Sequence, residues 1–466
     1  MDLYNRYGND INAADSGCGY NAFVICASTG KAAVAVGGTT VHAAFKLTRS
    51  SKRDGGLSPK RTQHLPRGLP QLDCRLRQIT QKLDHLFGGL DMILCGDLRQ
   101  LPPVRASEIY KRCRETGGLF GMAIKWHYVD YFPLVRVVRQ ADATFSGLLT
   151  KIGDGRALDD NEVALLESRF VTAEEALMRA PAAVRLFYSN EHVDAFNTLV
   201  TNTYANDSDP EHRVIRVRAR DIFLGYANEE AMLKAQAKVA KMSNAEFANL
   251  PRQILLVVDK PYMITANIDV IDGLVNGAVG TLKLCERSVD GAGGEEDFPR
   301  RLWLHFDGPA TGKLARLRST HAVSEASRLG YEVYAAWVPI EPRNATLTID
   351  RKTGVACKRT QFPLVQASAV TVHKSQGGTY ASIVYDYAKT HPQKLVYVAV
   401  SRCTNIQNLY LTNASADHRF HYKNNNIDKN MVDEFKRLDI HRLDTRFHLV
   451  PTHENLAVCV PYELVS

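Results

Sequence analysis

The stretch FVICASTGKAAVAVGGTTVHAAF, residues 23–45, places Thr29-Gly30-Lys31 directly after a short apolar run. An apolar strand that ends in a polar turn and continues into an Ala-rich helix is typical of a layered α/β fold. Open α/β sheets bind ligands at the carboxyl ends of their strands, which is where this turn would lie. The turn is therefore either a phosphate-binding group or a plain strand-turn-helix with a surface lysine.

The spacing around this turn excludes an ATP-binding P-loop. A Walker A loop requires G-x-x-x-x-G-K-[ST], because its backbone N–H groups wrap the phosphates and its hydroxyl binds Mg²⁺. In the opening stretch Ile25 stands in the first glycine position and Ala32 in the hydroxyl position. The other Gly-Lys pair, in GPATGKL at residues 308–314, has its first glycine one residue too close and Leu314 in place of the hydroxyl. Neither pair predicts an ATP loop.

Composition indicates a globular chain of several domains. The 466 residues are 45% hydrophobic and carry a net charge of +8, which favours either a polyanionic partner or a basic surface kept for solubility. No apolar run approaches the roughly 18 residues of a membrane span, and the N-terminus lacks a secretion signal, so the sequence predicts an intracellular protein without a membrane partner. The nine cysteines form no CxxC pair, and no metal site is predicted.

Short apolar runs with helix-like segments between them predict α/β layers with a largely parallel sheet. Residues 50–72 are predicted to be loop or disorder, and residues 228–250 to be helical. Residues 277–362 predict a small domain of antiparallel strands with a turn at 291–297. The predicted buried strands are residues 22–27, 92–95, 184–188, 254–258, 369–372, 383–385 and 409–411.

Four further segments carry a recognisable order of motifs. They are CRLRQITQKLDHLFGGLDMILCGDLRQLPPV (74–104), LVRVVRQADATFSGLLTKIGDG (134–155), MITANIDVIDGLVNGAVGTL (263–282), and QFPLVQASAVTVHKSQGGTY with KLVYVAVSRCTN (361–405). Together with STGKAA they resemble the petite-integration-frequency (PIF) family of superfamily 1 DNA helicases, including the versions carried by Helitron-type transposons. The resemblance covers about residues 1–412.

The resemblance implies a fold and a domain order. The fold would be α/β, with two RecA-like (P-loop NTPase) domains that close on ATP and Mg²⁺ and move 5′ to 3′ along single-stranded DNA, plus a small inserted β-barrel domain. Residues 1–150 would form a partial N-terminal RecA-like domain with motifs Ia, III and IV. The C-terminal RecA-like domain, with motifs V and VI, would comprise residues 151–276 and 363–412. The inserted domain would span residues 277–362, and residues 413–466 would form a tail with a basic polar helix.

The resemblance also assigns a nucleotide site. GDLRQLPPV looks like motif III, whose carboxylate and carboxamide would sense the γ-phosphate; a strand followed by a rigid Pro-Pro turn is the alternative. Two arginines would stabilise charge on the γ-phosphoryl group; solvated surface arginines are the alternative. A Gln-Gly pair of motif V would couple DNA to nucleotide, and a polar turn is the alternative. The implied catalytic residues are Gln100, Arg139 and Arg402, and the implied nucleotide-binding residues are Asp97, Gln100, Gln376 and Gly377.

The implied DNA contacts come from motifs Ia and V. STGKAA looks like motif Ia, which would hold backbone phosphate, and the histidine that follows it is either close to the strand or packed on its helix. Asn276-Gly277 would begin the β barrel, or is an ordinary hairpin turn. The implied nucleic-acid-binding residues are Thr29, Gly30, Lys31, His42, Thr371, His373, Lys374 and Ser375.

The departures from the family fall on the hydrolytic chemistry. Walker A should precede STGKAA, and MDLYNRYGND resembles the end of the helix that follows that loop. Walker B should lie where residues 50–72 stand, and Asp73 lies on the helix side of that gap. ATP hydrolysis depends on both, so residues 1–466 are predicted to show no ATP hydrolysis. The first RecA-like domain is predicted to be weakly stable, because the flanking strands lose hydrogen-bond partners.

Three functions are consistent with these patterns. The first is an ATP-dependent 5′–3′ DNA helicase that acts as a nuclear monomer in telomere maintenance, DNA repair or recombination, and that is truncated and catalytically incomplete in this chain. The second is a non-hydrolysing remnant of a transposon helicase that still binds single-stranded nucleic acid. The third is a RecD-like or other α/β binding module with no role on DNA.

Overall fold

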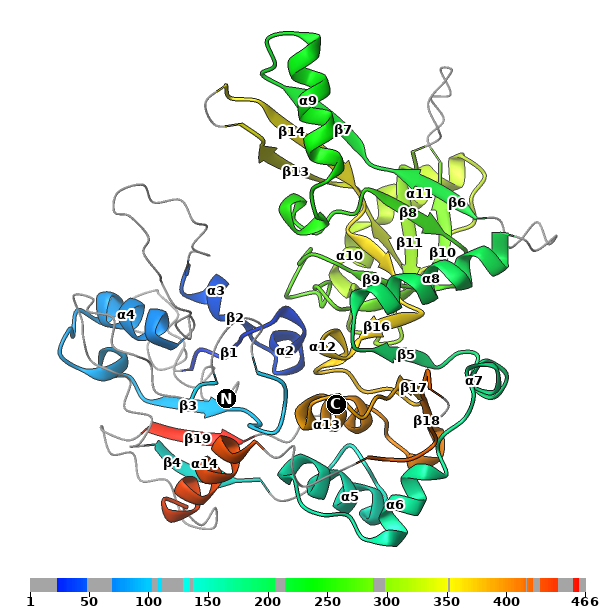
Figure 1. Ribbon diagram of the computed structural model, residues 1–466. Helices are drawn as coiled ribbons and strands as arrows, with labels where there is room; N and C mark the ends of the chain where they lie inside the picture. Colours follow the sequence, from blue (N-terminus) through cyan, green and yellow to red (C-terminus); the bar gives the residue numbers. More distant parts are fainter. Residues whose placement is uncertain are drawn as a thin grey trace. The chain divides into compact units, whose positions relative to one another are not determined.

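Figure 1 shows the computed structural model, which describes residues 23–47, 69–102, 108–110, 129–134, 137–205, 214–287, 298–350, 353–415, 417–421, 428–442 and 456–460. The chain divides into two compact units, which are described one at a time. The first comprises residues 1–181 and 375–466, and the second residues 182–374. The domain boundaries implied by the motifs stay a prediction. Residues 1–22, most of the predicted loop at 50–72, and the turn at 291–297 lie outside the described residues.

The first unit alternates short helices with strands that pair in parallel. Its helices are α2 (Gly30–Ala35), α3 (Val41–Ala44), α4 (Leu69–Thr80), η1 (Leu86–Gly89), α5 (Ala143–Asp154), α6 (Asp160–Glu167), α7 (Ala173–Arg179), α13 (Gln393–Ser401), η5 (Ile406–Asn408) and α14 (Lys429–Ile440). Its strands are β1 (Cys26–Ala27), β2 (Thr39–Thr40), β3 (Met92–Cys95), β4 (Val129–Pro133), β17 (Ile383–Asp386), β18 (Leu409–Thr412) and β19 (Leu456–Val460).

The opening stretch folds as the predicted strand-turn-helix. Thr29 is the N-cap of α2, and its hydroxyl accepts a hydrogen bond from the backbone N–H of Ala32 at 3.3 Å. Strand β2 returns to pair with β1 in parallel, with Cys26 opposite Thr39. The strand itself is shorter than predicted, since only Cys26–Ala27 pair within residues 22–27. The polar turn therefore lies at the carboxyl end of β1.

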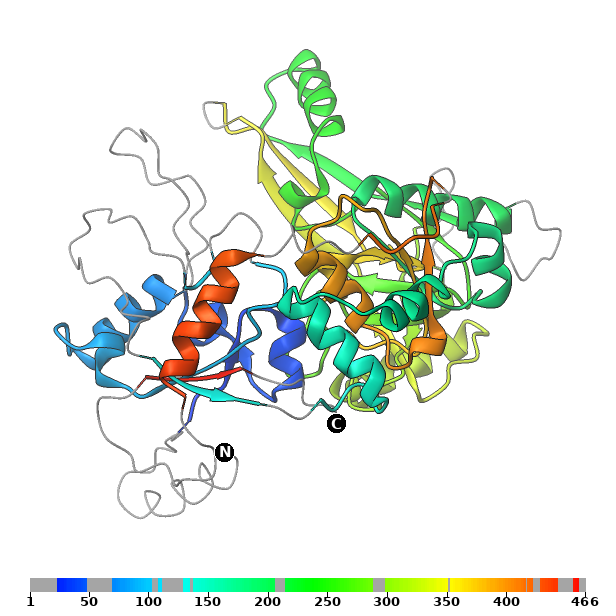
Figure 2. The same ribbon diagram turned by 60° about the horizontal axis from the view of Figure 1, so that its bottom comes forward.

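A strand from the C-terminal region lies between β3 and β4. Strand β19 pairs in parallel with both of them, and helix α14 packs beside the sheet through Leu438 and Phe435 (Figures 1 and 2). The helix confirms the one expected within residues 413–466, but the sequence did not predict the strand. The expectation that the flanking strands lose hydrogen-bond partners is wrong for β3 and β4, because β19 supplies those partners.

Helix α4 is fixed to the following turn by one buried carboxylate. Asp73 accepts two hydrogen bonds from the guanidinium Nε of Arg77, at 3.0 and 2.9 Å, and one from the backbone N–H of Phe87 at 2.6 Å. Gly88 has a φ of +66°, and a Cβ there would lie 2.8 Å from the carbonyl oxygen of Leu76, so this turn requires glycine. The predicted loop at 50–72 is wrong at its end, because α4 begins at Leu69.

The second unit is dominated by antiparallel strands. Its helices are α8 (Asn190–Ala205), α9 (Glu229–Ala240), η4 (Asn244–Phe247), α10 (Lys313–Arg318), α11 (Thr320–Arg328) and α12 (Val372–Ser375), which ends at the boundary with the first unit. Its strands are β5 (Val184–Phe187), β6 (Ile215–Arg218), β7 (Arg220–Leu224), β8 (Gln253–Leu256), β9 (Pro261–Ile264), β10 (Val279–Glu286), β11 (Arg301–His305), β12 (Trp337–Ile340), β13 (Arg343–Thr348), β14 (Ala356–Gln361), β15 (Leu364–Gln366) and β16 (Ala369–Thr371).

The strands predicted within residues 277–362 are confirmed as antiparallel. One sheet has the order β12-β11-β10-β9-β15 and therefore extends beyond 277–362 on both sides, while β13, β14 and β7 form another. The region also contains α10 and α11, which the sequence did not predict. Strands β5 and β16 pair in parallel elsewhere in this unit. The closure of these sheets into a barrel stays a prediction.

The helix predicted at 228–250 is shorter in the structure. Asn228 caps α9 by accepting from the backbone N–H of Ala231 at 2.9 Å, and the helix ends at Ala240. A separate 3₁₀ turn, η4, follows Ser243, whose backbone N–H donates to Glu246 at 3.0 Å. A Ser followed by Glu three residues later favours a new helix start over continuation, which accounts for the break.

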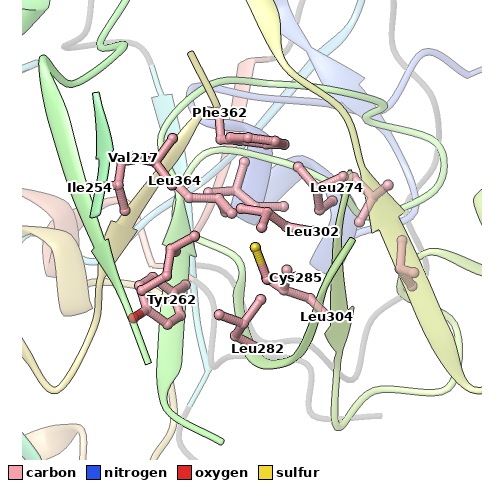
Figure 3. Packing of buried hydrophobic residues seen from close by; sticks show 14 of the residues in the cluster. Val217, Ile254, Tyr262, Leu274, Leu282, Cys285, Leu302, Leu304, Phe362 and Leu364 are labelled. Atoms are coloured by element: carbon pink, nitrogen blue, oxygen red, sulfur yellow. The ribbon is translucent and has the colours of Figure 1, made fainter. Parts of the chain in front are cut away.

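The main core of the second unit lies under the five-stranded sheet (Figure 3). Leu282, Leu302 and Leu304 are fully buried there, and the ring of Tyr262 lies among them. Beside this core, the carboxylate of Glu286 is also fully buried, and it accepts from the indole N–H of Trp303 at 2.9 Å. The same carboxylate forms an ion pair with Arg301 at 2.9 Å.

Candidate nucleotide site

Three polar side chains join the turn after β3 to the turn after α12. The carboxamide of Gln376 donates to Gln100 Oε1 over 3.0 Å, and the carboxamide of Gln100 donates to Asp97 Oδ2 over 3.4 Å. Asp97 also accepts from the backbone N–H of Arg99 at 3.0 Å, which closes its own turn. The first unit thus brings together three of the residues implied for nucleotide binding, and Gly377 follows Gln376 at the same turn, with a φ of 74°.

Tyr397 connects this polar chain to helix α13. Its hydroxyl donates to Asp97 Oδ2 over 3.1 Å, and burial, followed by the charge of Asp97, raises the pKa of the phenol. Arg99 forms an ion pair with Asp154 at 2.6 Å, and its guanidinium lies 5.0 Å from the ring centre of Phe435. These contacts hold the turn that carries Asp97 against α13, α5 and α14.

Arg139 and Gln140 bind the main chain at the end of α13. Arg139 donates to the carbonyl oxygen of Ser401 at 3.0 Å and to the hydroxyl of Thr379 at 3.1 Å. Gln140 is buried, and its carboxamide donates to the carbonyl oxygens of Ser401 and Cys403 at 3.1 and 2.9 Å. The Arg-Gln pair is therefore positioned by Ser401 and Cys403, at the end of α13.

We expect Gln140→Leu to lower the free energy of unfolding by about 1 to 3 kcal/mol, because it removes the donor for two buried carbonyl oxygens. Gln407→Leu is the matched control, since Gln407 is exposed and its change should stay within about 0.5 kcal/mol. Urea denaturation followed by circular dichroism measures both. Equal losses for the two variants would contradict a structural role for Gln140.

Arg402 follows α13 and is almost completely buried. Its guanidinium donates to the carbonyl oxygens of Val398 and Gly378, at 2.9 and 3.1 Å, and to the hydroxyl of Ser401 at 2.9 Å. Burial lowers the pKa of Arg402, yet the guanidinium stays charged, because an arginine begins with a pKa above 12. A buried charge is screened less by water, so Arg402 would act strongly on a nearby anion.

Lys31 directs its ammonium group at the same turn. Its Nζ lies 6.0 Å from the ring centre of Tyr380 and 2.8 Å from where a Cβ on Gly378 would lie. That Cβ would also lie 2.9 Å from the carbonyl oxygen of Ser375, so glycine suits this position. Burial, followed by the charges of Arg402 and Arg139, lowers the pKa of Lys31 to about 8. Three cations of the first unit therefore lie within electrostatic reach of one another.

The second Gly-Lys pair is closed to phosphate by its own fold. The carboxylate of Asp272 accepts from the backbone N–H groups of Leu314 and Ala315 at 2.6 and 2.8 Å. The carbonyl oxygen of Asp272 accepts from the N–H of Gly312 at 2.7 Å. The N–H groups that a phosphate would need at the start of α10 are therefore already bound, which agrees with the exclusion made from spacing.

In the first unit, the residues implied for DNA contact differ in exposure. Thr29 is exposed but caps α2, Gly30 is buried, and His42 is exposed in α3. Lys31 lies among the cations described above. Ser375 is fully buried, which does not favour direct contact of its side chain with a strand.

In the second unit, His373 and Lys374 of α12 are exposed, whereas Thr371 is buried at 6% exposure. The hydroxyl of Thr371 accepts from the backbone N–H of Lys374 at 3.4 Å. The exposed pair can reach a ligand, while Thr371 serves the turn. DNA contact by these residues stays a prediction.

Three residues that position the site were not predicted from the sequence: Arg99, Gln140 and Tyr397. All three lie within the quoted motif segments, but the sequence does not show their partners. The hydroxyl of Tyr397 in the otherwise apolar run KLVYVAV was the available signal.

The donors present fit the phosphate end of a nucleotide, since guanidinium, ammonium and carboxamide groups meet there. Among the described residues there is no group of three or more His, Cys, Asp or Glu side chains placed to hold a metal ion. Within the same residues no helix is both long and apolar enough to cross a membrane.

The chain is similar in sequence to known helicases. The family model of PIF1-like helicases matches residues 64–163. The ATP-dependent DNA helicase PIF1 of Xenopus laevis is 26% identical over 406 residues, which cover 82% of this chain and 53% of that protein. The chain is therefore similar to PIF1-like helicases. It spans about half or less of the length of these curated relatives.

Solved structures support the fold of this chain. The crystal structure of Pif1 helicase from Candida albicans has a TM-score of 0.56 and 22% identity, covering 90% of this chain and 88% of that one. Pif1 from Bacteroides in complex with ADP-AlF3 and single-stranded DNA has a TM-score of 0.54 and 20% identity, covering 89% and 86%. The predicted fold class, α/β with two RecA-like domains and parallel sheets, is confirmed.

Proposed function

We propose that residues 1–466 carry the nucleotide-sensing and DNA-binding parts of an ATP-dependent 5′–3′ DNA helicase, with hydrolysis incomplete within these residues. The observation that carries the proposal is the side-chain network of the first unit. Asp97, Gln100 and Gln376, from segments far apart in the chain, are hydrogen-bonded in series. Tyr397 connects them to the helix that ends before Arg402.

In this proposal the network reports the state of the terminal phosphate of ATP. Arg139 and Arg402 would stabilise charge on the γ-phosphoryl group, an effect worth about 10³ to 10⁵ in rate for such arginines. Asp97 and Gln100 would hold bound water at the same end of the nucleotide. Gln376 and Gly377 would carry the signal toward α12. ATP with Mg²⁺ would supply the phosphoryl group and the metal charge, whereas the described residues supply the surrounding cations and carboxamides.

Single-stranded DNA is the proposed partner. Pif1 from Bacteroides is bound to single-stranded DNA in its solved structure, and the exposed His42, His373 and Lys374 belong to the segments that resemble DNA-binding motifs. We propose action as a monomer in the nucleus, in telomere maintenance, DNA repair or recombination, and a Helitron-like relationship. A non-hydrolysing remnant of a transposon helicase is the second candidate, favoured by the absence of a Walker A pattern from the 466 residues.

The purified chain is expected to bind a dT oligonucleotide with an affinity that falls as salt rises, by about 0.7 in log affinity per log salt for each phosphate neutralised. Fluorescence anisotropy at several salt concentrations measures this. If the chain does not bind the oligonucleotide, or if its affinity does not change with salt concentration, the proposed DNA binding is wrong. Under the same conditions no DNA-stimulated ATP hydrolysis is expected, and a turnover that disappears in Arg402→Ala would show that hydrolysis is complete in this chain.

A further inference from the structure

The only cation of the STGKAA segment is Lys31, and its ammonium group lies beside the turn at residues 378–380. Lys31 lies one residue after the start of α2, and its ammonium group reaches the turn that carries Gly378 and Tyr380. Arg139 binds Thr379 in that turn, and Arg402 binds the carbonyl oxygen of Gly378. One short turn is therefore approached by three positively charged side chains from separate segments of the first unit.

Like charges held together repel, so this arrangement is costly while no anion is bound. Among the described residues, no carboxylate lies within ion-pair distance of the Lys31 ammonium group. Asp97 acts electrostatically on Arg139 and Arg402, whereas the charges that act on Lys31 are those of these two arginines. A bound dianion would interact favourably with all three cations.

We propose that Lys31 acts with Arg139 and Arg402 as a third phosphate-binding cation of the nucleotide site, and that together they take the terminal phosphate of a nucleoside triphosphate. The inference rests on the proposed function and replaces the DNA contact expected for Lys31. A terminal phosphate group carries about −1.5 to −2 charges near neutral pH, whereas each internal phosphate of DNA carries one. The dianion therefore matches the three cations better than a DNA backbone phosphate does. Asp97, which accepts from the carboxamide of Gln100, also acts electrostatically on Arg139 and Arg402.

The pH dependence follows from the groups around Lys31. The arginines stay charged, while burial raises the pKa values of Tyr380 and Tyr397. Lys31, with a pKa of about 8, is therefore the group that loses its charge first as pH rises. A bound phosphate favours the ammonium form, so binding takes up a proton above pH 8 and the affinity should fall between pH 7 and 9.5. Lys31→Arg should remove most of that fall, because a guanidinium stays charged over this range.

Isothermal titration of residues 1–466 with ATPγS, with ADP and with a dT oligonucleotide tests the proposal. The unaltered chain should bind ATPγS more tightly than ADP. Lys31→Met should weaken ATPγS binding by about 10- to 100-fold, the effect of a lost charge-assisted hydrogen bond, and leave ADP and dT affinities within about twofold. Lys31→Arg should retain ATPγS binding. Lys82→Met, which removes an exposed lysine of the same unit, is the matched control and should change nothing.

A second readout separates this role from a structural one. Lys31→Met removes a like charge from beside Arg139 and Arg402, so the melting temperature without ligand should stay equal or rise, whereas loss of a structural contact would lower it. If Lys31→Met weakens dT binding and leaves ATPγS binding unchanged, Lys31 contacts DNA and the proposal is wrong. Unchanged affinities for all ligands would also overturn the proposal. If the unaltered chain binds dT but neither nucleotide, this inference fails and the DNA part of the proposed function stands; if it binds none of them, both fail.

Discussion

Replacing Glu286 by Ala should lower the free energy of unfolding of the second unit by about 3 to 5 kcal/mol. The carboxylate is fully buried and serves two partners, the guanidinium of Arg301 and the indole N–H of Trp303, each at 2.9 Å. Its removal leaves a buried N–H without an acceptor and reduces the charge that compensates Arg301. Hydrogen exchange of amides in β10 and β11 at increasing urea measures the loss in this unit alone.

The same arginine offers a matched control. Glu341 also pairs with Arg301, at 3.4 Å, but its side chain is 70% exposed. Water screens that pair, so Glu341→Ala should cost no more than about 1 kcal/mol. Glu286→Gln should fall between the two, because the carboxamide oxygen can still accept from Trp303. Similar losses for Glu286→Ala and Glu341→Ala would show that burial of the carboxylate does not determine its contribution.

Asp73→Ala should produce a comparable loss in the first unit, about 3 to 5 kcal/mol. The guanidinium of Arg77 is 2% exposed and forms its ion pair with Asp73 at 2.9 Å. The same carboxylate accepts from the backbone N–H of Phe87, so the substitution leaves both a buried charge and a buried N–H uncompensated. Protection of α4 amides from hydrogen exchange should fall accordingly.

Asp84→Ala is the control for this site, because Asp84 is exposed in the turn that follows α4. Its change should stay within about 0.5 kcal/mol. The double variant Asp73→Ala/Arg77→Met should recover part of the stability lost in Asp73→Ala, because it removes the stranded charge. Unchanged stability in the single variant would contradict a structural role for Asp73.

Much of the fold could be predicted from local patterns. The runs at residues 184–188 and 409–411 form partly buried strands, because apolar and β-branched residues suit a buried pleated surface. Residues 92–95 also form a strand, but the prediction that it is buried is wrong, since its residues are exposed or half-buried and Ile93 is 50% exposed. The prediction for residues 228–250 was too long, because Ser243 and Glu246 start a new turn within a helix-favouring composition. Helices α10 and α11 were missed because strands on both sides gave the whole region an antiparallel character.

The candidate site could be predicted in part. Resemblance to helicase motifs drew attention to Asp97, Gln100 and Gln376, and the structure places these three in one hydrogen-bonded series. The contribution of Gln140 was not predictable, because its partners are main-chain carbonyl oxygens that carry no signal in the sequence. The burial of Ser375 was not predictable either, because the sequence of a polar turn does not show which side chain faces the interior.

The sequence by itself determined the strand-turn-helix at STGKAA, the exclusion of a P-loop at both Gly-Lys pairs, and an order of motifs that resembles PIF1-like helicases. These follow from residue type and spacing, which act over a few neighbouring residues. Only the tertiary structure decided that β19 lies between β3 and β4, and that Lys31 faces Arg139 and Arg402. Strand pairing and the distances between charges depend on contacts between segments that are far apart in the sequence. Patterns of neighbouring residues do not predict these contacts.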